Sequence, residues 1–465
     1  MMDDRIEEDS LGQVKILKKA LWGIHTQRAL ENFTISSFRS SQIFIRAMAL
    51  VKKACCLANL DTGYLAKDKA SAMIQACDEI IEGRHSNQFP LDALQGGAGT
   101  SMNMNMNEVI ANRGLEIMGY DPGHYSMLHP LKDVNMHQST NDVYPTAVKI
   151  AALQGLKTLS HKIELLQGVF QKKEKEFARI VKTGRTEMQE AVPMTLGAEF
   201  SAFAEAIARD RWRIFKCEER IRCVNLGGTA VGTGLAAPRS YIFLVIDKLR
   251  EFTALGLSRG ENVVDQTANS DNFVEVAGIL KAHVANVIKI CNDLRLLNML
   301  GEIRLKPVQA GSSIMPGKVN PVILEAALQA CLKVDADCQM VLETASRSSF
   351  QINEFMPLLA MSLLEALEIL ANVNAMLSKH IETLSANEDV CLKYIENNPL
   401  IITAFLPHLG YEKCEQLLKE FLAQVTDQPN IKKFLMEKLG KEIVEKTLLP
   451  EHLMSLGYKD HGKST

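Results

Sequence analysis

Residues 146–182 read TAVKIAALQGLKTLSHKIELLQGVFQKKEKEFARIVK. The segment contains no proline, and its apolar residues recur at the spacing of one helix face. A run of roughly 30 residues exceeds the average helix of about 11–12 residues and would be about 45 Å long. Because so long a helix cannot cover its own apolar stripe, the segment predicts a bundle of packed helices.

Similar runs follow along the chain, at about 195–225, 271–299, 321–346 and 358–383. Glycine and proline separate them and mark turns or helix ends. A mixed helical part with Gly-rich loops, 1–138, precedes the long runs of 139–388, and shorter helical pieces follow over 389–465. No strand-rich region or internal repeat stands out, so the sequence predicts a mainly α fold.

The composition excludes several classes of protein. Of 465 residues, 47% are hydrophobic and 23% charged, and the net charge is −3, which gives no basic field for nucleic acid or membrane. No apolar run is expected to span a bilayer. The opening MMDDRIEEDS is acidic where a secretory signal would be basic and then apolar. Ten scattered cysteines without metal-binding spacing lead us to expect reduced thiols in a cytoplasmic protein.

The first segment with chemical promise is GGAGTSMN, residues 96–103. Its three glycines precede Thr100 and Ser101, so backbone N–H groups and hydroxyls could converge on an anion. A tight turn before a helix, with Thr100 or Ser101 as the N-cap, would use the same residues.

The second segment is QSTND, residues 138–142, which directly precedes a long helical run. A helix N-terminus favours a carboxylate, and Ser139, Thr140 and Asn141 supply neutral donors there. Helix capping is the alternative, although three or four capping residues in a row exceed what one cap needs.

The third segment is QAGSSIMPGKVNP, residues 309–321. Its two glycines and two prolines exclude a continuous helix, yet apolar helical runs flank it on both sides. An ordinary helix–helix connection would be shorter and would not carry one cation and two hydroxyls. The segment therefore indicates a functional loop on a helical scaffold.

GSSIMPGKVNP resembles the signature loop of the fumarase/aspartase branch of the aspartase/fumarase superfamily. Further motifs resemble this family in order along nearly the whole chain: IEEDSLG, WGIHTQRALENF, GGAGTSMNMNMNEVIANRG, DVNMHQSTNDVYPTA, GRTEMQEAVPMTLGAEF, NLGGTAVGTGL and KICNDLRLL. The resemblance implies three mainly helical domains, 1–138, 139–388 and 389–465. It also implies a homotetramer whose central helices form one bundle, active sites that collect residues from three subunits, and no cofactor or metal.

The resemblance also implies a reaction in which a proton leaves the carbon beside one carboxylate and a group leaves the neighbouring carbon. Ser312 is expected to be the general base, helped by an environment that stabilises its alkoxide. Hydroxyls would meet the charge that develops on the adjacent carboxylate; they belong to Thr100, Ser101, Ser139, Thr140, Thr186 and Ser313. The remaining substrate contacts would come from Asn141 and Glu187 at the amino group and from Lys318 and Asn320 at the other carboxylate.

GIHT at 23–26 and the Ser-Thr pair in QSTND resemble aspartases more than fumarases. They favour elimination of ammonia from L-aspartate to give fumarate. A fumarate hydratase, a related amino-diacid lyase or a catalytically silent lyase-fold protein are the alternatives. Glu187 bears on this choice, because a carboxylate suits a substrate ammonium and suits malate poorly, although it could also be a solvated helix-start residue.

Two departures from the family pattern lie near the expected site. The connection at 298–308 lacks the family's Ser-Gly-Pro-Arg stretch, and Ala236 stands where GTGL is usually followed by Asn. Two histidines are ambiguous. His25 is as easily a structural hydrogen-bond partner as a site residue, and His137 fits helix-entry packing or a supporting role better than catalysis.

Overall fold

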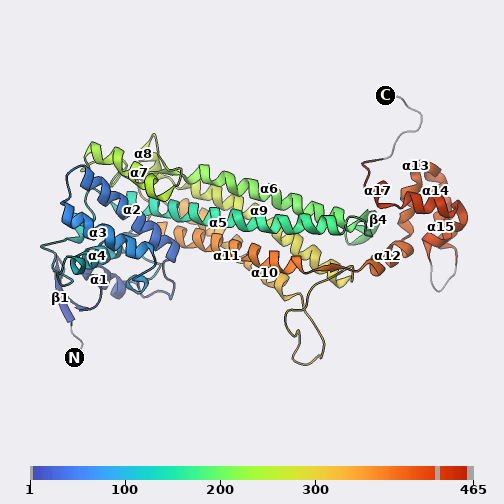
Figure 1. Ribbon diagram of the computed structural model, residues 1–465, viewed down its shortest axis with the longest axis horizontal. Helices are drawn as coiled ribbons and strands as arrows, with labels where there is room; N and C mark the ends of the chain where they lie inside the picture. Colours follow the sequence, from blue (N-terminus) through green and yellow to red (C-terminus); the bar gives the residue numbers. More distant parts are fainter. Residues whose placement is uncertain (1–3, 425–429, 458–465) are drawn as a thin grey trace. The chain divides into compact units, whose positions relative to one another are not determined.

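The computed structural model describes residues 4–424 and 430–457, most of which are helical (Figure 1). The chain forms two compact units, each of which combines three segments of sequence. The first unit takes its described residues from 1–161, 212–284 and 331–371, and the second from 162–211, 285–330 and 372–465. The three-domain division at 138/139 and 388/389 stays a prediction.

Each long apolar run of the sequence is a helix, which confirms the mainly α class. The long helices are α5 (Thr140–Glu176), α6 (Leu196–Ile221), α9 (Asp271–Met299), α10 (Val322–Ala345) and α11 (Met356–Glu382). Turns rich in glycine and proline separate them where the apolar periodicity stops. Helix α5 ends at Glu176, earlier than the periodicity suggested, because the chain from Val181 onward pairs as a strand.

In the first unit, shorter helices surround the start of α5. They are α1 (Ile24–Asn32), α2 (Gln42–Asp61), α3 (Lys67–Ile81), α4 (Thr100–Ile117), α7 (Arg239–Thr253) and α8 (Val263–Ala268), with the 3-10 turn η1 (Ser86–Gln88) and the π-helical turn η2 (Pro130–Val134). Helix α2 packs on α3 and α7, and α4 packs on α3. The rings of Phe44 in α2 and Tyr144 in α5 are in tilted contact, with centroids 4.8 Å apart.

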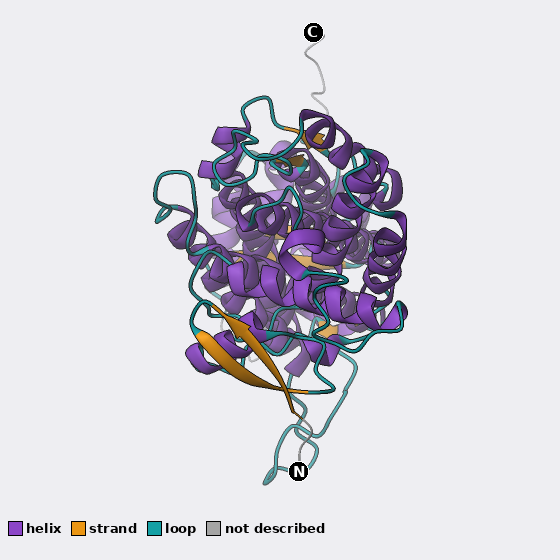
Figure 2. Ribbon diagram, turned by 90° about the vertical axis from the view of Figure 1, so that its left-hand side faces the viewer, coloured by secondary structure: helices purple, strands orange, loops and turns teal. Residues whose placement is uncertain are grey.

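The short strands were not expected from the sequence. Strands β1 (Asp4–Asp9) and β2 (Gly12–Leu17) form an antiparallel hairpin, which Figure 2 draws as a crossed pair of orange strands. In β1 the carboxylate residue Glu7 is buried whereas Ile6 is 62% exposed. The apolar residues therefore do not mark the buried face, and alternation could not reveal this strand. Strands β5 (Cys223–Val224) and β6 (Ser258–Arg259) pair in parallel.

The second unit contains the antiparallel hairpin of β3 (Val181–Thr186) and β4 (Gln189–Thr195). Strand β7 (Ile303–Arg304) pairs with β8 (Ser385–Ala386). Shorter helical pieces follow: α12 (Glu388–Asn397), η3 (Pro399–Phe405), α13 (Leu406–Leu409), α14 (Tyr411–Leu422), α15 (Ile431–Leu439), α16 (Lys441–Thr447) and α17 (Pro450–Leu453). Their core includes Phe405, Phe421, Phe434 and Leu435.

Helix α11 corrects one expectation from the sequence, because by length and composition it could cross a membrane. Of its most apolar window, 67% is buried within the protein. A core helix of a folded domain has the same composition, since it is covered on most sides by other helices. We interpret α11 as such a core helix.

Candidate active site

The N-termini of α4 and α5 meet through a glycine. Gly99 precedes α4 with a φ of 87°, and a Cβ built on it would lie 2.4 Å from the ring of Tyr144 in α5. Only glycine allows both this backbone conformation and this close approach. Thr100 and Ser101 are partly buried in the first turn of α4, and neither hydroxyl hydrogen-bonds another described residue. They are available to a ligand at a helix N-terminus.

A buried amide joins the two helix starts. Asn103 Nδ2 in α4 donates to Thr140 Oγ1, the first residue of α5, over 3.0 Å. Ser139 Oγ accepts the backbone N–H of Asn141 at 3.2 Å, so its own proton is free to donate outward. Thr100, Ser101, Ser139 and Thr140 are thus held around the same pair of helix N-termini.

Pro145 explains how Asn141 is fixed. A proline has no N–H to donate, so the carbonyl four residues earlier, that of Asn141, is left without its helical partner. Asn225 Nδ2 donates to this carbonyl at 2.9 Å, and the side-chain Nδ2 of Asn141 donates to the carbonyl of Ala230 at 2.7 Å. The NLGGT segment is therefore attached to the QSTND segment, as two motifs far apart in the sequence.

Asp142 completes this attachment. Its carboxylate is fully buried and accepts backbone N–H groups from Ser139, Gly227 and Thr229, each at 3.0 Å. Burial raises the pKa of Asp142 to about 6, although the three N–H donors oppose that rise. The residue holds the loop and the start of α5 in one geometry.

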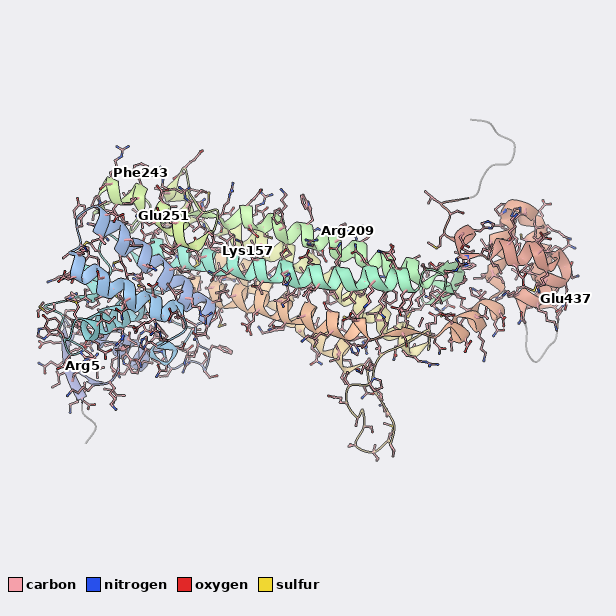
Figure 3. All side chains as sticks on the ribbon, viewed as in Figure 1. Arg5, Lys157, Arg209, Phe243, Glu251 and Glu437 are labelled. Carbon is pink, nitrogen blue, oxygen red and sulfur yellow. The ribbon has the colours of Figure 1, made fainter. Side chains whose placement is uncertain are left out.

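The signature segment is an exposed loop between α9 and α10, visible in Figure 1 as the irregular yellow-orange segment and in Figure 3 with its side chains as sticks. Ser312 lies near its start and is partly exposed. Its Oγ accepts the backbone N–H groups of Met315 at 2.9 Å and Ile314 at 3.2 Å. Two fixed donors on one serine oxygen stabilise negative charge there.

The base of this loop is closed by hydrogen bonds. Gly311 N–H donates to the carbonyl of Lys318 at 2.8 Å, and Asn320 Nδ2 donates to the carbonyl of Gly311 at 2.7 Å. A Cβ on Gly311 would lie 2.6 Å from that Lys318 oxygen, so the closure requires glycine. The side chains of Ser313 and Lys318 are exposed and pair with no described residue.

Thr186 and Glu187 lie at the tip of the β3–β4 hairpin, both exposed. Glu187 and Met188 form its two-residue turn with φ values of 51° and 60°. Two positive φ values define a type I′ turn, which glycine and asparagine occupy without strain. Glutamate and methionine there are strained, and strain of this kind concentrates at functional sites. Glu187 is therefore a turn residue, and the helix-start alternative was wrong.

Buried charges that the sequence did not reveal hold the base of this hairpin. Glu302 is fully buried, and its carboxylate lies 3.2 Å from Lys182 Nζ and 2.8 Å from Arg185 Nη1. Lys182 also pairs with Glu199 at 2.7 Å. Glu302 belongs to the 298–308 connection in which the family's usual stretch is missing, and no pattern in the sequence marked it.

The ambiguous positions can now be interpreted. The backbone N–H of His25 donates to the buried Glu108 at 2.8 Å, which ties GIHT to α4. His137 has a φ of 59°, lies 2.7 Å from Asn59 Oδ1 through Nδ1 and packs against Tyr64. Ala236 has a φ of 70°, a conformation that asparagine tolerates better than alanine, which explains the family's preference there.

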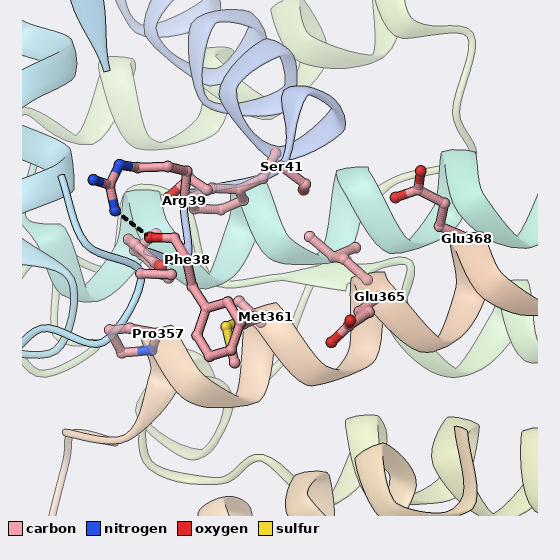
Figure 4. A pocket seen from close by; sticks show the side chains of 13 residues that line it. Phe38, Arg39, Ser41, Pro357, Met361, Glu365 and Glu368 are labelled. Carbon is pink, nitrogen blue, oxygen red and sulfur yellow. Dashed lines mark hydrogen bonds between the residues drawn. The ribbon is translucent and has the colours of Figure 1, made fainter. Parts of the chain in front are cut away.

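A cavity of about 280 Å³ in the first unit contains none of the expected site residues (Figure 4). It lies between the chain before α2 and one face of α11, and its lining includes Arg39, Tyr144, Met361, Glu365 and Glu368. Within residues 4–424 and 430–457, no cluster of three or more His, Cys, Asp or Glu side chains could hold a metal ion.

Comparisons with known proteins agree with the family that the motifs resemble. A family model described as Lyase matches residues 12–335. The chain is 43% identical to the aspartate ammonia-lyase of Corynebacterium glutamicum, over 97% of this chain and 87% of that one. It is 42% identical to the aspartate ammonia-lyase of Helicobacter pylori, over 97% and 98%.

Solved structures agree. A fumarate lyase:delta crystallin from Brucella melitensis, bound to cobalt, superposes with a TM-score of 0.92 at 40% identity, covering 97% of this chain and 99% of that one. A class II fumarase from Schistosoma mansoni gives a TM-score of 0.89 at 27% identity, covering 96% and 98%. The matches in sequence and in structure both extend along nearly the whole chain, and the protein belongs to the lyase family that includes the aspartate ammonia-lyases.

Proposed function

We propose that the protein is an aspartate ammonia-lyase that converts L-aspartate into fumarate and ammonia. The observation that carries the proposal is the signature loop, in which Ser312 Oγ receives two backbone N–H groups, in a chain above 40% identical to named aspartate ammonia-lyases.

Ser312 takes the proton from the carbon next to one substrate carboxylate. A serine is a poor base in water, but the N–H groups of Ile314 and Met315 point at its oxygen and favour the alkoxide. The C–H electron pair moves into the adjacent carboxylate and forms an enediolate-like dianion. The proton remains on Ser312.

Hydroxyl donors meet that charge as it develops, and neutral dipoles do so without binding the substrate too tightly. The helix N-termini of α4 and α5 add their free N–H groups to the hydroxyls. This set comprises Thr100, Ser101, Ser139, Thr140, Thr186 and Ser313.

The electron pair then returns from the dianion to form the carbon–carbon double bond while the C–N bond breaks. Nitrogen keeps the electrons of that bond and leaves as ammonia. Asn141 and Glu187 contact the substrate ammonium, whereas Lys318 and Asn320 hold the distant carboxylate. Closure of the exposed loop excludes water and brings base and anchor to the substrate together.

We also propose a homotetramer with active sites shared between subunits, acting in the cytoplasm. All ten cysteines are free and nine of them are buried, as suits a reducing compartment. The proposed site residues are divided between two compact units of the chain, which suits a site completed by other subunits.

Absorbance at the fumarate band tests the activity directly. The purified protein should release fumarate and ammonia from L-aspartate and should not hydrate fumarate detectably. Glu187→Gln should weaken aspartate binding, because it removes the partner of the substrate ammonium, whereas a malate enzyme would be unaffected or improved. Hydration of fumarate at a rate equal to deamination or above it would reject the aspartase assignment and favour the fumarase alternative.

A further inference from the structure

We propose that Lys52 is a positioning residue that sets the direction of the hydrogen bonds beneath the two helix N-termini, so that Thr140 presents its hydroxyl proton to the substrate. The inference rests on the proposed function, because Thr140 is one of the hydroxyls assigned to the developing charge. Lys52 itself hydrogen-bonds none of the proposed site residues.

Apart from the attraction of the fully buried Asp142 carboxylate, to which it makes no hydrogen bond, the buried cation Lys52 has no anionic partner among the described residues. It lies on α2 with 1% of its surface exposed, and it forms no ion pair with any of the described residues. Its Nζ donates instead to two side-chain oxygens, Gln138 Oε1 at 2.8 Å and Asn135 Oδ1 at 3.1 Å. A buried cation is costly and is retained where it serves a specific purpose.

An ammonium group can only donate hydrogen bonds, which removes an ambiguity from its neighbours. An amide side chain can present either oxygen or nitrogen to a polar partner, but beside Lys52 both Asn135 and Gln138 must present oxygen. Burial lowers the pKa of Lys52 to about 8, so the group still carries its proton in most molecules at neutral pH. The direction of the network is therefore fixed at this end.

The oxygen of Asn135 also fixes the orientation of two asparagine side chains in α4. Asn135 Oδ1 also accepts Asn103 Nδ2 at 3.3 Å and Asn107 Nδ2 at 3.1 Å. Because an oxygen faces them, both asparagines must turn their NH₂ groups toward Asn135. Their own Oδ1 atoms are buried and have no hydrogen-bond partner among the described residues, so the network keeps this direction although it leaves two acceptors unused.

The last member of the network is Thr140. Asn103 Nδ2 donates to Thr140 Oγ1 at 3.0 Å, so that hydroxyl is an acceptor toward the protein interior. Its proton has no acceptor among the residues that the structure describes, and Thr140 is 8% exposed at the start of α5. The hydroxyl proton is thus left for an anion at the helix N-terminus. Reversal of the amides would let Thr140 donate inward and would remove this donor from the site.

A double-mutant cycle of Lys52→Met and Thr140→Val tests the coupling. Each variant should lower kcat by roughly 10–100-fold with a smaller change in KM, as expected for one lost donor to a developing charge. If Lys52 acts through Thr140, the double variant should be no slower than the slower single variant. Independent, multiplying effects would overturn the proposal.

Lys149→Met is the control for losing a buried lysine. Lys149 is also 1% exposed and also donates only to neutral oxygens, the carbonyl of Cys223 and Gln266 Oε1. The loss of kcat caused by Lys149→Met should multiply with the loss caused by Thr140→Val. Equal coupling of Lys149 and Lys52 to Thr140 would mean that any buried lysine acts in this way, and it would reject the special role of Lys52.

Asn103 and Asn107 give a second test that does not depend on whether Lys52→Met folds. Both are buried in α4, both donate to the same Asn135 oxygen, and only Asn103 also contacts Thr140. Asn103→Leu and Asn107→Leu should lower the melting temperature to a similar degree. Only Asn103→Leu should lower kcat by 10-fold or more, and an equal loss in both variants would contradict the proposal.

Binding of succinate, a dicarboxylate without an amino group, separates this inference from the proposed function. If the wild-type protein binds succinate in calorimetry but releases no ammonia from aspartate, the proposed function fails. The cycle can then be measured on the succinate dissociation constant. Coupled losses of succinate affinity in the cycle would support the role of Lys52. Additive losses of affinity, or undetectable binding by the wild-type protein, would reject it.

Discussion

Ser312 shows how a weak base gains its strength from a few backbone atoms. A free serine hydroxyl is not ionised near neutral pH, and no histidine or lysine side chain hydrogen-bonds this one among the described residues. Its oxygen instead receives two N–H groups from the loop that carries it. Because Gly311 and Asn320 close the base of that loop, the N–H groups are held before substrate binds, and the alkoxide needs little further reorganisation.

Ser312→Ala should therefore lower kcat by about 10²–10⁴-fold, the usual contribution of a proton-transfer group. Its melting temperature should stay within about 1–2 °C of wild type, since a partly exposed loop hydroxyl adds little to a chain of this size. Steady-state kinetics and calorimetry measure both quantities. Turnover close to wild type would show that another group takes the proton.

The sequence could predict some of the proposed site and not the rest, for a physical reason. Ser312, Lys318 and Asn320 stand out because glycine and proline around them interrupt an apolar helical pattern. Lys52 carries no such mark, since a lysine within a helical run is usually a solvated surface residue. Asn103 and Asn135 lie in two of the quoted motifs, but nothing in those motifs distinguishes them from their polar neighbours. Only the fold shows that Lys52 and Asn103 are buried and that both donate hydrogen bonds to the partly buried Asn135.

At the scale of elements, the β3–β4 hairpin combines a strained tip with a charged base. Glu187 and Met188 occupy left-handed backbone positions at the turn. The base is fixed by the pairs that Lys182 and Arg185 make with the buried Glu302. Because strained turns persist only where surrounding structure holds them, the ion network should keep Thr186 and Glu187 in place.

Glu302→Gln should lower the free energy of unfolding by about 3–5 kcal/mol, because it leaves the buried Lys182 without half of its compensating charge. Activity should fall as well, through a misplaced hairpin tip. The matched control is Glu382→Gln, which breaks the Lys172–Glu382 pair of the same unit, exposed by 62% and 55%. That change should cost less than about 1 kcal/mol. Urea titration of both variants measures their free energies of unfolding, and equal losses of stability would contradict the prediction.

The long helices were predictable and the hairpins were not. Apolar residues in α5, α9 and α11 recur every three or four positions over seven or more turns, which no strand can imitate. In β1 the buried face carries Glu7 rather than an apolar residue, and β3 buries Lys182 beside Thr183. Strands whose buried faces are polar and satisfied by ion pairs leave no alternation in the sequence.

At the scale of the whole molecule, several large apolar side chains are exposed on the described surface, and their exposure does not stabilise a monomer. Helix α10 exposes Leu332 at 65% and Leu342 at 43%, and α6 exposes the stacked pair Trp212 and Phe215. Scattered exposed apolar residues are ordinary, but several on long helices fit association of like subunits. Light scattering should therefore give the mass of a homotetramer.

Shared active sites make a sharper prediction than mass alone. Thr140→Val removes a group from the first unit and Ser312→Ala removes one from the second, and each variant tetramer should keep at most about a tenth of the wild-type activity. If a site takes these two residues from different subunits, tetramers reassembled from an equal mixture should contain about a quarter of intact sites, because each residue is independently intact in half of them. If one chain supplies both residues, every site keeps one defect and mixing restores no activity.

Unfolding and refolding the two variants together, with each variant alone as the control, measures the difference in fumarate release. Absence of recovery in a mixture shown to contain mixed tetramers would place both residues in one subunit and reject the shared site.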